Sequence, residues 1–405
     1  MSTTPLPIPI LERQRPWLLV GWLTIFLVGT DLFVVSPFLP QIGSALERDP
    51  AQLTLMVSLF SFTYAIACPL QGRLAERIGV AKVLLFGIIS IAAANLLTAL
   101  ATNVPTLFLS RALAGLAAAS ISPMLYVMAA ERSEPAQRAT NLARINSGLV
   151  IALMFGAPLG LVMGNYLGWR WVFGLLALAF VVMFPINHSV WKTSRYVRPR
   201  SSSDAVAQEP LHGAALYLIC MVLWAASTYA GYTLLATALY AEYSLSAGEV
   251  ALVLACFGLG ALIGSLQGGR MADQLGSIVM VRLCFIAMVC TNVSLYFIYQ
   301  MHSVWALCLV MFTLSLVSYG FFPALQATAA ERFVARRPTV MGLLSSSLYV
   351  GIMIGATAGG VVYRAISMTG VIALAAALAL VGVGVASQLR SKSQQNLSTL
   401  VESQR

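Results

Sequence analysis

The sequence has few charged residues. Asp, Glu, Lys and Arg make up only 9% of its 405 residues, as 14 acidic and 24 basic side chains, whereas soluble domains contain about 25%. So few charges could not keep a protein of this size in water, which excludes a soluble enzyme. A chain that is 59% hydrophobic is also too apolar to be disordered. The mean hydropathy of +0.85 instead indicates a membrane protein.

Reactive and metal-binding residues are scarce as well. The six cysteines lie inside apolar runs without C-x-x-C spacing, and the three histidines lie near the ends of such runs, so we expect no disulfide, redox centre or metal site. The sequence contains no Walker loop, no H-E-x-x-H motif and no nucleophile elbow. These absences predict a protein that is not an enzyme, has no cofactor and takes its energy from a gradient rather than from ATP.

Long apolar runs dominate the sequence. A helix that crosses the hydrocarbon core needs about 20 mainly apolar residues, and runs of this kind are too long and uniform for barrel strands. We therefore predict an all-α membrane protein with twelve transmembrane helices, the first of which is retained rather than cleaved as a signal peptide. The predicted spans are residues 17–40, 53–71, 80–101, 105–129, 141–164, 171–190, 213–240, 249–268, 278–299, 303–328, 339–362 and 369–389.

The basic residues predict an orientation. Lys and Arg accumulate in short cytoplasmic loops of membrane proteins. With the N-terminus inside, the cytoplasmic segments hold 20 of the 24 basic residues and the outer loops hold three. We therefore predict a multi-pass protein of the cytoplasmic membrane with both termini in the cytoplasm. Because the net charge of +10 is spread between the spans, it indicates no nucleic-acid partner.

An internal repeat divides the chain. GRLAERIG (72–79) recurs as GRMADQLG (269–276), and AAER (129–132) recurs as AAER (329–332). A nearly constant offset of this kind indicates two six-helix halves in the same orientation, as in transporters. The predicted division is an N-terminal half at 1–190, a cytoplasmic linker at 191–212 and a C-terminal half at 213–405.

Glycines at every fourth position mark the fifth and eleventh spans. The two ladders are Gly156, Gly160 and Gly164, with Pro158 among them, and Gly351, Gly355 and Gly359. Such a ladder lets a neighbouring helix approach closely where lipid supplies no hydrophobic drive. The sequence allows two interpretations, tight helix packing or a rocking interface between the halves.

These motifs resemble those of the major facilitator superfamily. GRLAERIGVAKVL (72–84) is similar to its signature loop, although Glu76 replaces the usual Asp and Val80-Ala81 replace the usual basic pair. SRALAGLAAAS (110–120) resembles a motif of the twelve-span drug/proton antiporters. GAPLGLVMGNYLGWRWVF (156–173) and DLFVVSPFLPQI (31–42) are closer to the arabinose-efflux-like subgroup. The resemblance covers the whole chain and implies the major facilitator fold.

The signature loop is a candidate cytoplasmic gate. The resemblance implies that its charges hold the halves closed on the inside, where Glu76 and Arg77, beside Arg73, could pair with Arg138 or with the start of the eleventh helix. The alternative is that the arginines serve only the orientation of the chain. The candidate gate residues are Gly72, Arg73, Glu76, Arg77, Gly79 and Arg138.

Two ionisable residues lie well inside predicted spans, which makes them candidates for function. Asp31 is about 13 Å from the end of the first span if that span ends near Pro40, and Arg111 is about 9 Å from the same face. Burial favours a protonated carboxyl and a nearby guanidinium favours a carboxylate, so the proton affinity of Asp31 would depend on whether the two residues pair. Proton coupling, a static structural pair and direct binding of a charged substrate group all stay open.

Polar and aromatic residues at mid-span are candidates for a substrate pocket, although each alone could serve helix packing. Together they suggest an amphipathic aromatic cavity. They are Tyr64, Asn95, Tyr126, Asn146, Trp224, Tyr229, Tyr232, Tyr319 and Tyr349.

The sequence therefore predicts a proton-coupled exporter of a small organic compound, such as a drug-like molecule, a sugar or a metabolite, that acts by alternating access. Its partners would be the cargo, protons and the lipid bilayer. One chain contains both halves, so a monomer is expected. Uptake by symport or facilitated diffusion is the main alternative, and a transporter-like receptor or scaffold is a remote one.

Overall fold

The computed structural model describes residues 16–133, 138–192, 213–333 and 337–389. All regular structure in these ranges is helical, and twelve helical segments are long and apolar enough to cross a membrane. The prediction of an all-α bundle with twelve spans is confirmed. The predicted linker, 191–212, lies almost wholly outside the described residues. The elements are α1 (Pro16–Phe33), α2 (Val35–Leu46), α3 (Leu55–Ile78), α4 (Val80–Ala99), α5 (Val104–Ala118), α6 (Ser122–Arg132), α7 (Arg138–Ile151), the π-helix η2 (Ala152–Gly156), α8 (Ala157–Leu167), α9 (Trp169–Trp191), α11 (Ala214–Tyr243), α12 (Ala247–Leu275), α13 (Ser277–Gln300), α14 (Val304–Arg332), α15 (Arg337–Ala365) and α16 (Met368–Ser387).

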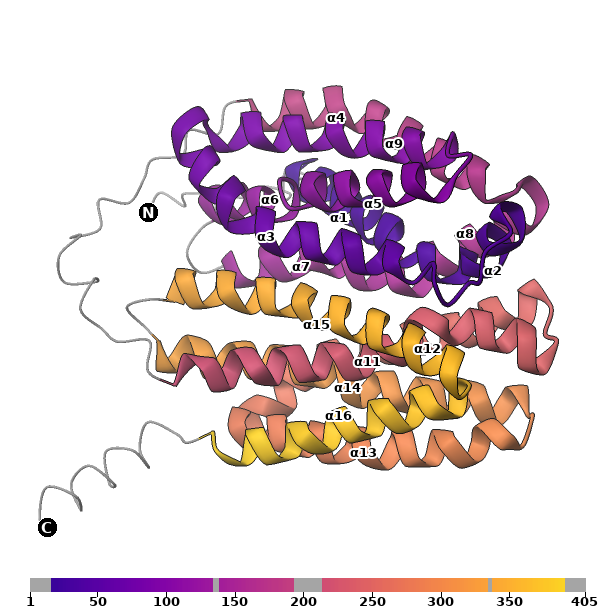
Figure 1. Cartoon of the computed structure of the whole chain (residues 1–405). Helices are drawn as coiled ribbons and strands as arrows, with labels where there is room; N and C mark the ends of the chain where they lie inside the picture. Colours follow the sequence, from indigo (N-terminus) through magenta and orange to yellow (C-terminus); the bar gives the residue numbers. More distant parts are fainter. Residues whose placement is uncertain (1–15, 134–137, 193–212, 334–336, 390–405) are drawn as a thin grey trace, which may run out of the picture.

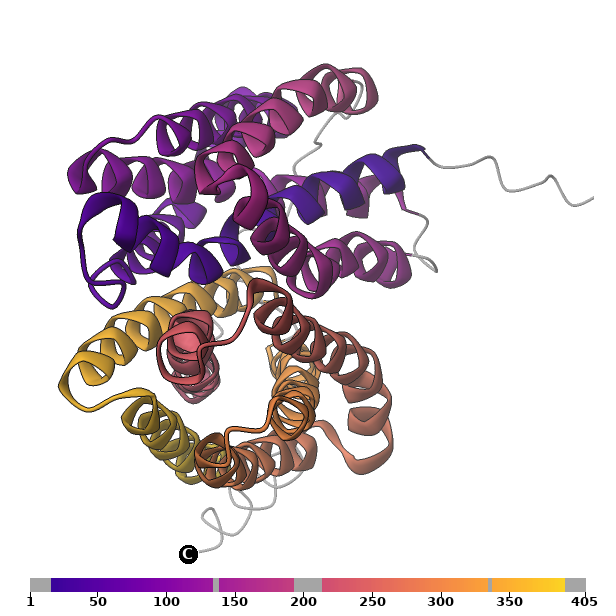
Figure 2. The same ribbon diagram turned by 90° about the vertical axis from the view of Figure 1, so that its right-hand side faces the viewer.

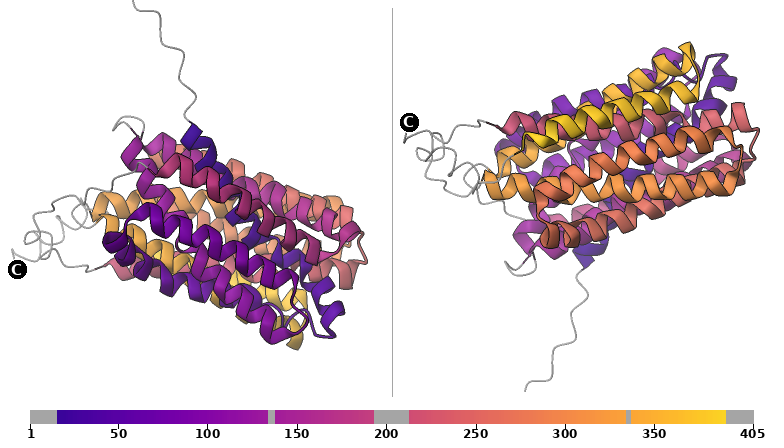
Figure 3. Two further views of the ribbon diagram at one scale, coloured as in Figure 1. Left: turned by 90° about the horizontal axis from the view of Figure 1, so that it is seen from above. Right: turned by 90° about the horizontal axis from the view of Figure 1, so that it is seen from below.

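The helices form two groups. Figure 1 shows α1–α9 above α11–α16, and Figure 2 shows the same separation from the side. The long helices of both groups run in roughly the same direction (Figure 3). We call the end of the bundle where α9 ends and α11 begins the linker end, and the opposite end, where α15 turns into α16, the turn end (Figure 1).

Apolar side chains cover much of the outside of the bundle. Phe86 is 64% exposed, Leu309 is 67% exposed and Trp305 is 77% exposed. Large exposed apolar surfaces are rare on soluble monomers. A hydrocarbon surrounding accounts for them, because lipid chains are as apolar as these side chains.

Three predicted spans contain an interruption, and each lies close before a proline. The first span breaks at Val34 before Pro37, the fourth at residues 119–121 before Pro123, and the fifth adopts a π-helical turn at 152–156 before Pro158. Proline cannot donate a hydrogen bond to the carbonyl four residues earlier, and its ring clashes with that carbonyl. The helix after the first break, α2, continues past Pro40 to Leu46.

The repeated loop motif has a clear local structure. Its last glycine is Gly79 in the first group and Gly276 in the second, with φ of 100° and 90°. Each glycine ends one helix and begins the next, with its N–H donating to Ala75 and Ala272 respectively. Side-chain-bearing residues avoid this positive-φ backbone, so the spacing of the motif follows from a tight helix–helix turn.

Candidate functional site

Asp31 and Arg111 form a buried ion pair. Asp31 lies near the end of α1 and Arg111 in the second turn of α5, and their side chains are 0% and 1% exposed. Nη1 of Arg111 lies 2.8 Å from Oδ1 of Asp31, and Nη2 lies 3.4 Å from Oδ2. The pairing that the sequence allowed is therefore present in the structure. Its role in coupling is a separate question, because the same geometry fits a static pair.

Arg111 also contacts the interruption of the first span. Its Nη2 donates to the backbone carbonyl of Asp31 at 3.3 Å, a carbonyl next to the point where α1 ends. Carbonyls in the last turn of a helix have no intrahelical donor, and a cation there interacts favourably with the helix dipole. One guanidinium thus holds both the side chain and the backbone of Asp31.

The surroundings of Arg111 are otherwise apolar. Its guanidinium lies 5.0 Å from the ring centre of Phe60 and 5.9 Å from that of Phe173. Its Nε is buried and has no hydrogen-bond partner in the part of the chain that the structure describes. Charge in such a place is costly unless it is paired, so the net charge of this site depends strongly on whether Asp31 carries a proton.

Six of the nine candidate pocket residues form a set of aromatic ring contacts, namely Tyr64, Trp224, Tyr229, Tyr232, Tyr319 and Tyr349. Tyr64 of α3 and Tyr349 of α15 stack with ring centres 3.6 Å apart. The hydroxyls of Tyr229 on α11 and Tyr319 on α14 are 3.0 Å apart. Tyr349 lies within electrostatic range of both Tyr126 and Tyr229, which places these pairs near one another. The tyrosines and Trp224 therefore come from helices of both groups and lie near one another.

Polar contacts fix Trp224 in this set and link Tyr126 with Asn146. The indole N–H of Trp224 donates to the carbonyl and the hydroxyl of Ser318, at 2.7 and 2.9 Å, and the ring packs on Tyr319. Tyr126 donates to Oδ1 of Asn146 at 2.8 Å. Asn95 does not join the set, because it donates to the carbonyl of Ile91 on its own helix. Its Oδ1 is buried and has no hydrogen-bond partner among the described residues, so a role for Asn95 in the pocket stays a prediction.

Phe33 connects the ion pair with the aromatic residues. It stacks on Tyr229 with ring centres 6.4 Å apart and meets the edge of Tyr232 at 6.2 Å. It lies two residues after Asp31, immediately before the break at Val34. Sequence reasoning missed Phe33 because phenylalanine is common in any span. Its spacing from Asp31 was the only signal.

Hydroxyls without partners line the same stretch of α11. Those of Tyr232, Thr233 and Thr237 are buried and have no hydrogen-bond partner among the described residues. A buried hydroxyl without a partner is unfavourable by roughly 1–3 kcal/mol. Such groups are available to hydrogen-bond water or a bound molecule.

The glycine ladders pack within each group. A Cβ added to Gly160 would lie 2.4 Å from Val34, and one added to Gly164 would lie 2.2 Å from Phe38, both in the first group. A Cβ added to Gly355 would lie 2.5 Å from the carbonyl of Ala226 in the second group. The tight-packing interpretation is therefore the one that fits, and these glycines do not form a rocking interface between the groups.

Contacts between the two groups are made by other residues, on α3, α12, α15 and η2. The hydroxyls of Ser58 on α3 and Thr357 on α15 lie 2.8 Å apart. A Cβ on Gly360 would lie 2.7 Å from the carbonyl of Ala51, and one on Gly258 of α12 would lie 2.2 Å from the backbone of Met154 in η2. The two groups are thus in close contact along α3–α15 and η2–α12.

The signature loop lies at the linker end, at the junction of α3 and α4. Arg73 and Arg77 are exposed and make no ion pair with another described residue. The side chains of Glu76 and Arg138 lie outside the described part of the chain. Among the described residues, none lies within 4 Å of a Cβ added to Gly72 or Gly79. The gate contacts implied by the resemblance stay a prediction.

Comparisons with known proteins agree with this architecture. The family model for the Major Facilitator Superfamily matches residues 21–237 and 216–402. The chain is 24% identical to the uncharacterized MFS-type transporter YceJ of Bacillus subtilis, over 87% of this chain and 90% of that protein. It is 25% identical to a probable sugar efflux transporter of Helicobacter pylori, over 85% and 88% of the two chains.

A third relative is named for chloramphenicol resistance. The chloramphenicol resistance protein of Streptomyces lividans is 29% identical over 61% of this chain and 64% of that protein. Two matched segments that together cover nearly the whole chain, twelve spans and the repeated loop motif agree with one another. This chain belongs to the Major Facilitator Superfamily, and it is therefore a multi-pass membrane transporter rather than an enzyme.

Proposed function

We propose that this transporter exports a small organic compound across the cytoplasmic membrane in exchange for protons. The observation that carries the proposal is the buried pair of Asp31 and Arg111. Ionisable groups in a membrane span are costly and commonly mark ion or substrate pathways. The two relatives named for sugar efflux and chloramphenicol resistance support export in general.

Proton binding at Asp31 would change the balance of charge at the site. A proton on the carboxyl removes the charge that Arg111 neutralises, and the 2.8 Å contact then loses most of its electrostatic attraction. Arg111 keeps its hydrogen bond to the carbonyl of Asp31 in either state. Protonation would therefore loosen the side-chain pair without releasing the end of α1.

The break at Val34 would link protonation of Asp31 to cargo binding. Phe33, beside the break, packs on Tyr229 and Tyr232 of the opposite group. A small change in the angle between α1 and α2 would move Phe33 against these tyrosines. Competition between proton and cargo would then follow, because each would favour a different angle at the break.

The aromatic set suggests an uncharged cargo. Its rings offer flat apolar faces, and its hydroxyls, including the unpartnered one of Tyr232, offer hydrogen bonds. Apart from Asp31, which Arg111 neutralises, the described buried residues include no carboxylate. A cationic compound would find no free opposite charge there, whereas a neutral ring or a hydroxylated compound would be accommodated.

Alternating access would move residues 1–190 and 213–405 against each other. We place the linker end and both termini in the cytoplasm, in accordance with the positive-inside rule. The contact of Ser58 with Thr357 near the turn end then closes the outer side. The signature loop, with Arg73, Arg77 and the partners Glu76 and Arg138, would close the inner side in the opposite state.

A proton-flux assay in inside-out vesicles tests the proposal. Vesicles with an acid interior are monitored with a pH dye while chloramphenicol, sugars and other neutral compounds are added. We expect a transported compound to discharge the gradient through the wild type but not through Asp31→Asn. Asp31→Glu, which keeps the carboxylate, should retain part of the flux.

Three results would overturn proton exchange through this site. The first is compound accumulation without proton movement, which would indicate facilitated diffusion. The second is equal discharge by the wild type and Asp31→Asn, which would reduce the pair to a structural role. The third is proton flux in the same direction as the compound, which would indicate symport.

A further inference from the structure

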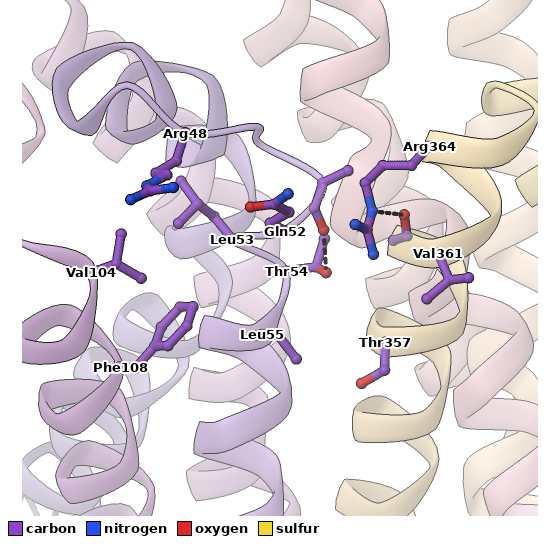
Figure 4. Close-up of a pocket in the computed structure, with 12 residues that line it drawn as sticks. Arg48, Gln52, Leu53, Thr54, Leu55, Val104, Phe108, Thr357, Val361 and Arg364 are labelled. Atoms are coloured by element: carbon purple, nitrogen blue, oxygen red, sulfur yellow. Dashed lines mark hydrogen bonds between the residues drawn. The ribbon is translucent and has the colours of Figure 1, made fainter.

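A cavity of about 460 Å³ opens at the turn end, where the two groups meet (Figure 4). Its walls come from the segment between α2 and α3, from the beginnings of α3 and α5, and from the last turns of α15. None of its lining residues belongs to the aromatic set or to the ion pair. The cavity is therefore a separate feature from the transport site, and it is bounded by both groups.

Two arginines line the cavity, one from each group. Figure 4 shows Arg48 and Arg364 on opposite sides of it. Both are exposed, and neither forms an ion pair with another residue in the described part of the chain. Arg364 donates from Nε to the carbonyl of Gly360 at 3.4 Å, which leaves its two terminal nitrogens free. The lining contains no carboxylate, so the cavity attracts an anion.

Two acidic residues, Glu47 and Asp49, flank Arg48 in the sequence, but neither forms an ion pair with Arg48 or Arg364 among the described residues, and Glu47 does not line the cavity. Asp49 follows Arg48 directly, but its carboxylate accepts the N–H of Ala51 at 2.9 Å. Asp49 is not among the residues that line the cavity. The two guanidinium groups therefore remain available to an oxyanion, for which their planar donor arrangement is well suited.

The lining also includes Gln52, Thr54 and Thr357, and its large apolar side chains lie deeper along the helices. Leu55 is 41% exposed and Val361 is 52% exposed. In Figure 4 these residues and Phe108 lie below the arginines, away from the helix ends. In a membrane, the ends of the spans lie at the level of the head groups and deeper residues face acyl chains. The polarity of the cavity thus follows the polarity of a lipid.

We propose that this cavity binds an anionic phospholipid. The lipid phosphate lies between Arg48 and Arg364, and an acyl chain follows the wall formed by Leu55, Phe108 and Val361. Because the lipid contacts both groups, it binds best when they are together at the turn end, the arrangement in which Ser58 and Thr357 are 2.8 Å apart. Anionic lipid therefore stabilises this conformation over one in which the turn end opens.

Binding of phosphatidylglycerol to the purified full-length protein tests the proposal. The delipidated protein is titrated with phosphatidylglycerol, phosphatidylcholine or inorganic phosphate, and bound lipid is counted by native mass spectrometry alongside the thermal unfolding temperature. We expect phosphatidylglycerol to raise the unfolding temperature most, because a ligand of the folded state stabilises it by mass action. Inorganic phosphate, which lacks the acyl chain, should have little effect.

The double variant Arg48→Gln/Arg364→Gln should bind phosphatidylglycerol about thirtyfold more weakly, since each basic residue at an anionic lipid surface contributes a factor of about five. Arg170→Gln is the matched control, because Arg170 lies at the same end but does not line the cavity. Val361→Trp, which fills the apolar wall without changing charge, should also lose the bound lipid.

Three results would overturn the proposal. Unchanged affinity in the double variant would place the lipid elsewhere, and an equal effect of phosphatidylcholine would show that the negative charge is not recognised. An equal effect of inorganic phosphate would identify a simple anion site. These outcomes are independent of proton exchange, because Asp31 and Arg111 remain intact in every variant used.

Discussion

The two six-helix groups share a repeated sequence pattern but differ in their helices. In the first group three spans are interrupted, at Val34, at residues 119–121 and at the π-helical turn 152–156. In the second group the corresponding spans, α11, α14 and α15, are each a single helix of 30, 29 and 29 residues. The buried ion pair lies in the first group, next to one of its interruptions.

One proline shows that the interruptions are not dictated locally. Pro123 follows the break between α5 and α6, whereas Pro323, at an offset of 200 residues, lies inside the unbroken helix α14. The neighbouring helix differs at this point. Gly87 of α4 packs directly against Ser120 and Ile121, whereas the side chain of Cys284 lies near Gly320 in the second group. Proline permits a break, and the packing of a neighbour decides whether it forms.

The difference suggests a division of labour. The first group combines charge with interrupted helices, and the second combines continuous helices with most of the aromatic and hydroxyl groups of the candidate pocket. Interrupted helices in membranes are tolerated where other groups satisfy the freed backbone, as Arg111 does for Asp31. We therefore expect substitutions in the first group to alter both stability and coupling, and substitutions in the second to alter cargo binding.

Removal of Arg111 should have the largest effect. Arg111→Gln leaves the carboxylate of Asp31 buried without its cation, which destabilises proteins by about 3–5 kcal/mol. The free energy of unfolding of the purified protein in detergent measures this loss. The double variant Asp31→Asn/Arg111→Gln should recover part of it, because no charge then remains buried. Equal stability of the single and double variants would contradict the importance of the charge balance.

The glycine ladders offer an intermediate effect that differs between the groups. Gly355→Ala meets the backbone of Ala226, which cannot turn away, whereas Gly160→Ala meets the side chain of Val34, which can change rotamer. We expect Gly355→Ala to lower the free energy of unfolding by about 1–3 kcal/mol, as overpacking does, and Gly160→Ala to lower it less.

Gly384→Ala serves as the control for this pair. Nothing lies within 4 Å of an added Cβ at Gly384 of α16. Alanine at such a helical position should stabilise the protein by about 0.4–1 kcal/mol. The same unfolding assay checks the order of the two variants. If Gly160→Ala lowers the free energy of unfolding more than Gly355→Ala does, the expected difference in packing between the two groups is wrong.

The prolines should have the smallest effect on stability and a selective effect on transport. Pro37 is in the first turn of α2, where backbone N–H groups have no partner within the helix, so Pro37→Ala should change the free energy of unfolding by less than about 1 kcal/mol. If the break at Val34 couples proton and cargo, Pro37→Ala should nevertheless slow transport in vesicles more than Pro323→Ala does. Equal transport by the two variants would contradict a role for the break.

Much of the fold could be predicted from the sequence because a lipid bilayer permits few backbone structures. Apolar runs of sufficient length must become helices, and the constant offset between repeated motifs indicated two similar halves. The sequence also singled out Asp31 and Arg111, since charge is rare inside spans. It could not rank the two interpretations of the glycine ladders, because their spacing shows that a helix approaches but not which helix.

Composition and spacing by themselves thus determined the helical class, the number of spans and the two buried charges, and the resemblance of the loop and helix motifs indicated the superfamily. The tertiary structure alone decided that Arg111 holds the backbone of Asp31 as well as its carboxylate, that Phe33 reaches Tyr229 and Tyr232, and that Arg48 and Arg364 face one cavity. The physical reason is that helix formation in a membrane is governed by local apolarity and backbone hydrogen bonding. Contacts between helices depend instead on rotation, tilt and breaks, which are set by close packing among residues far apart in the chain.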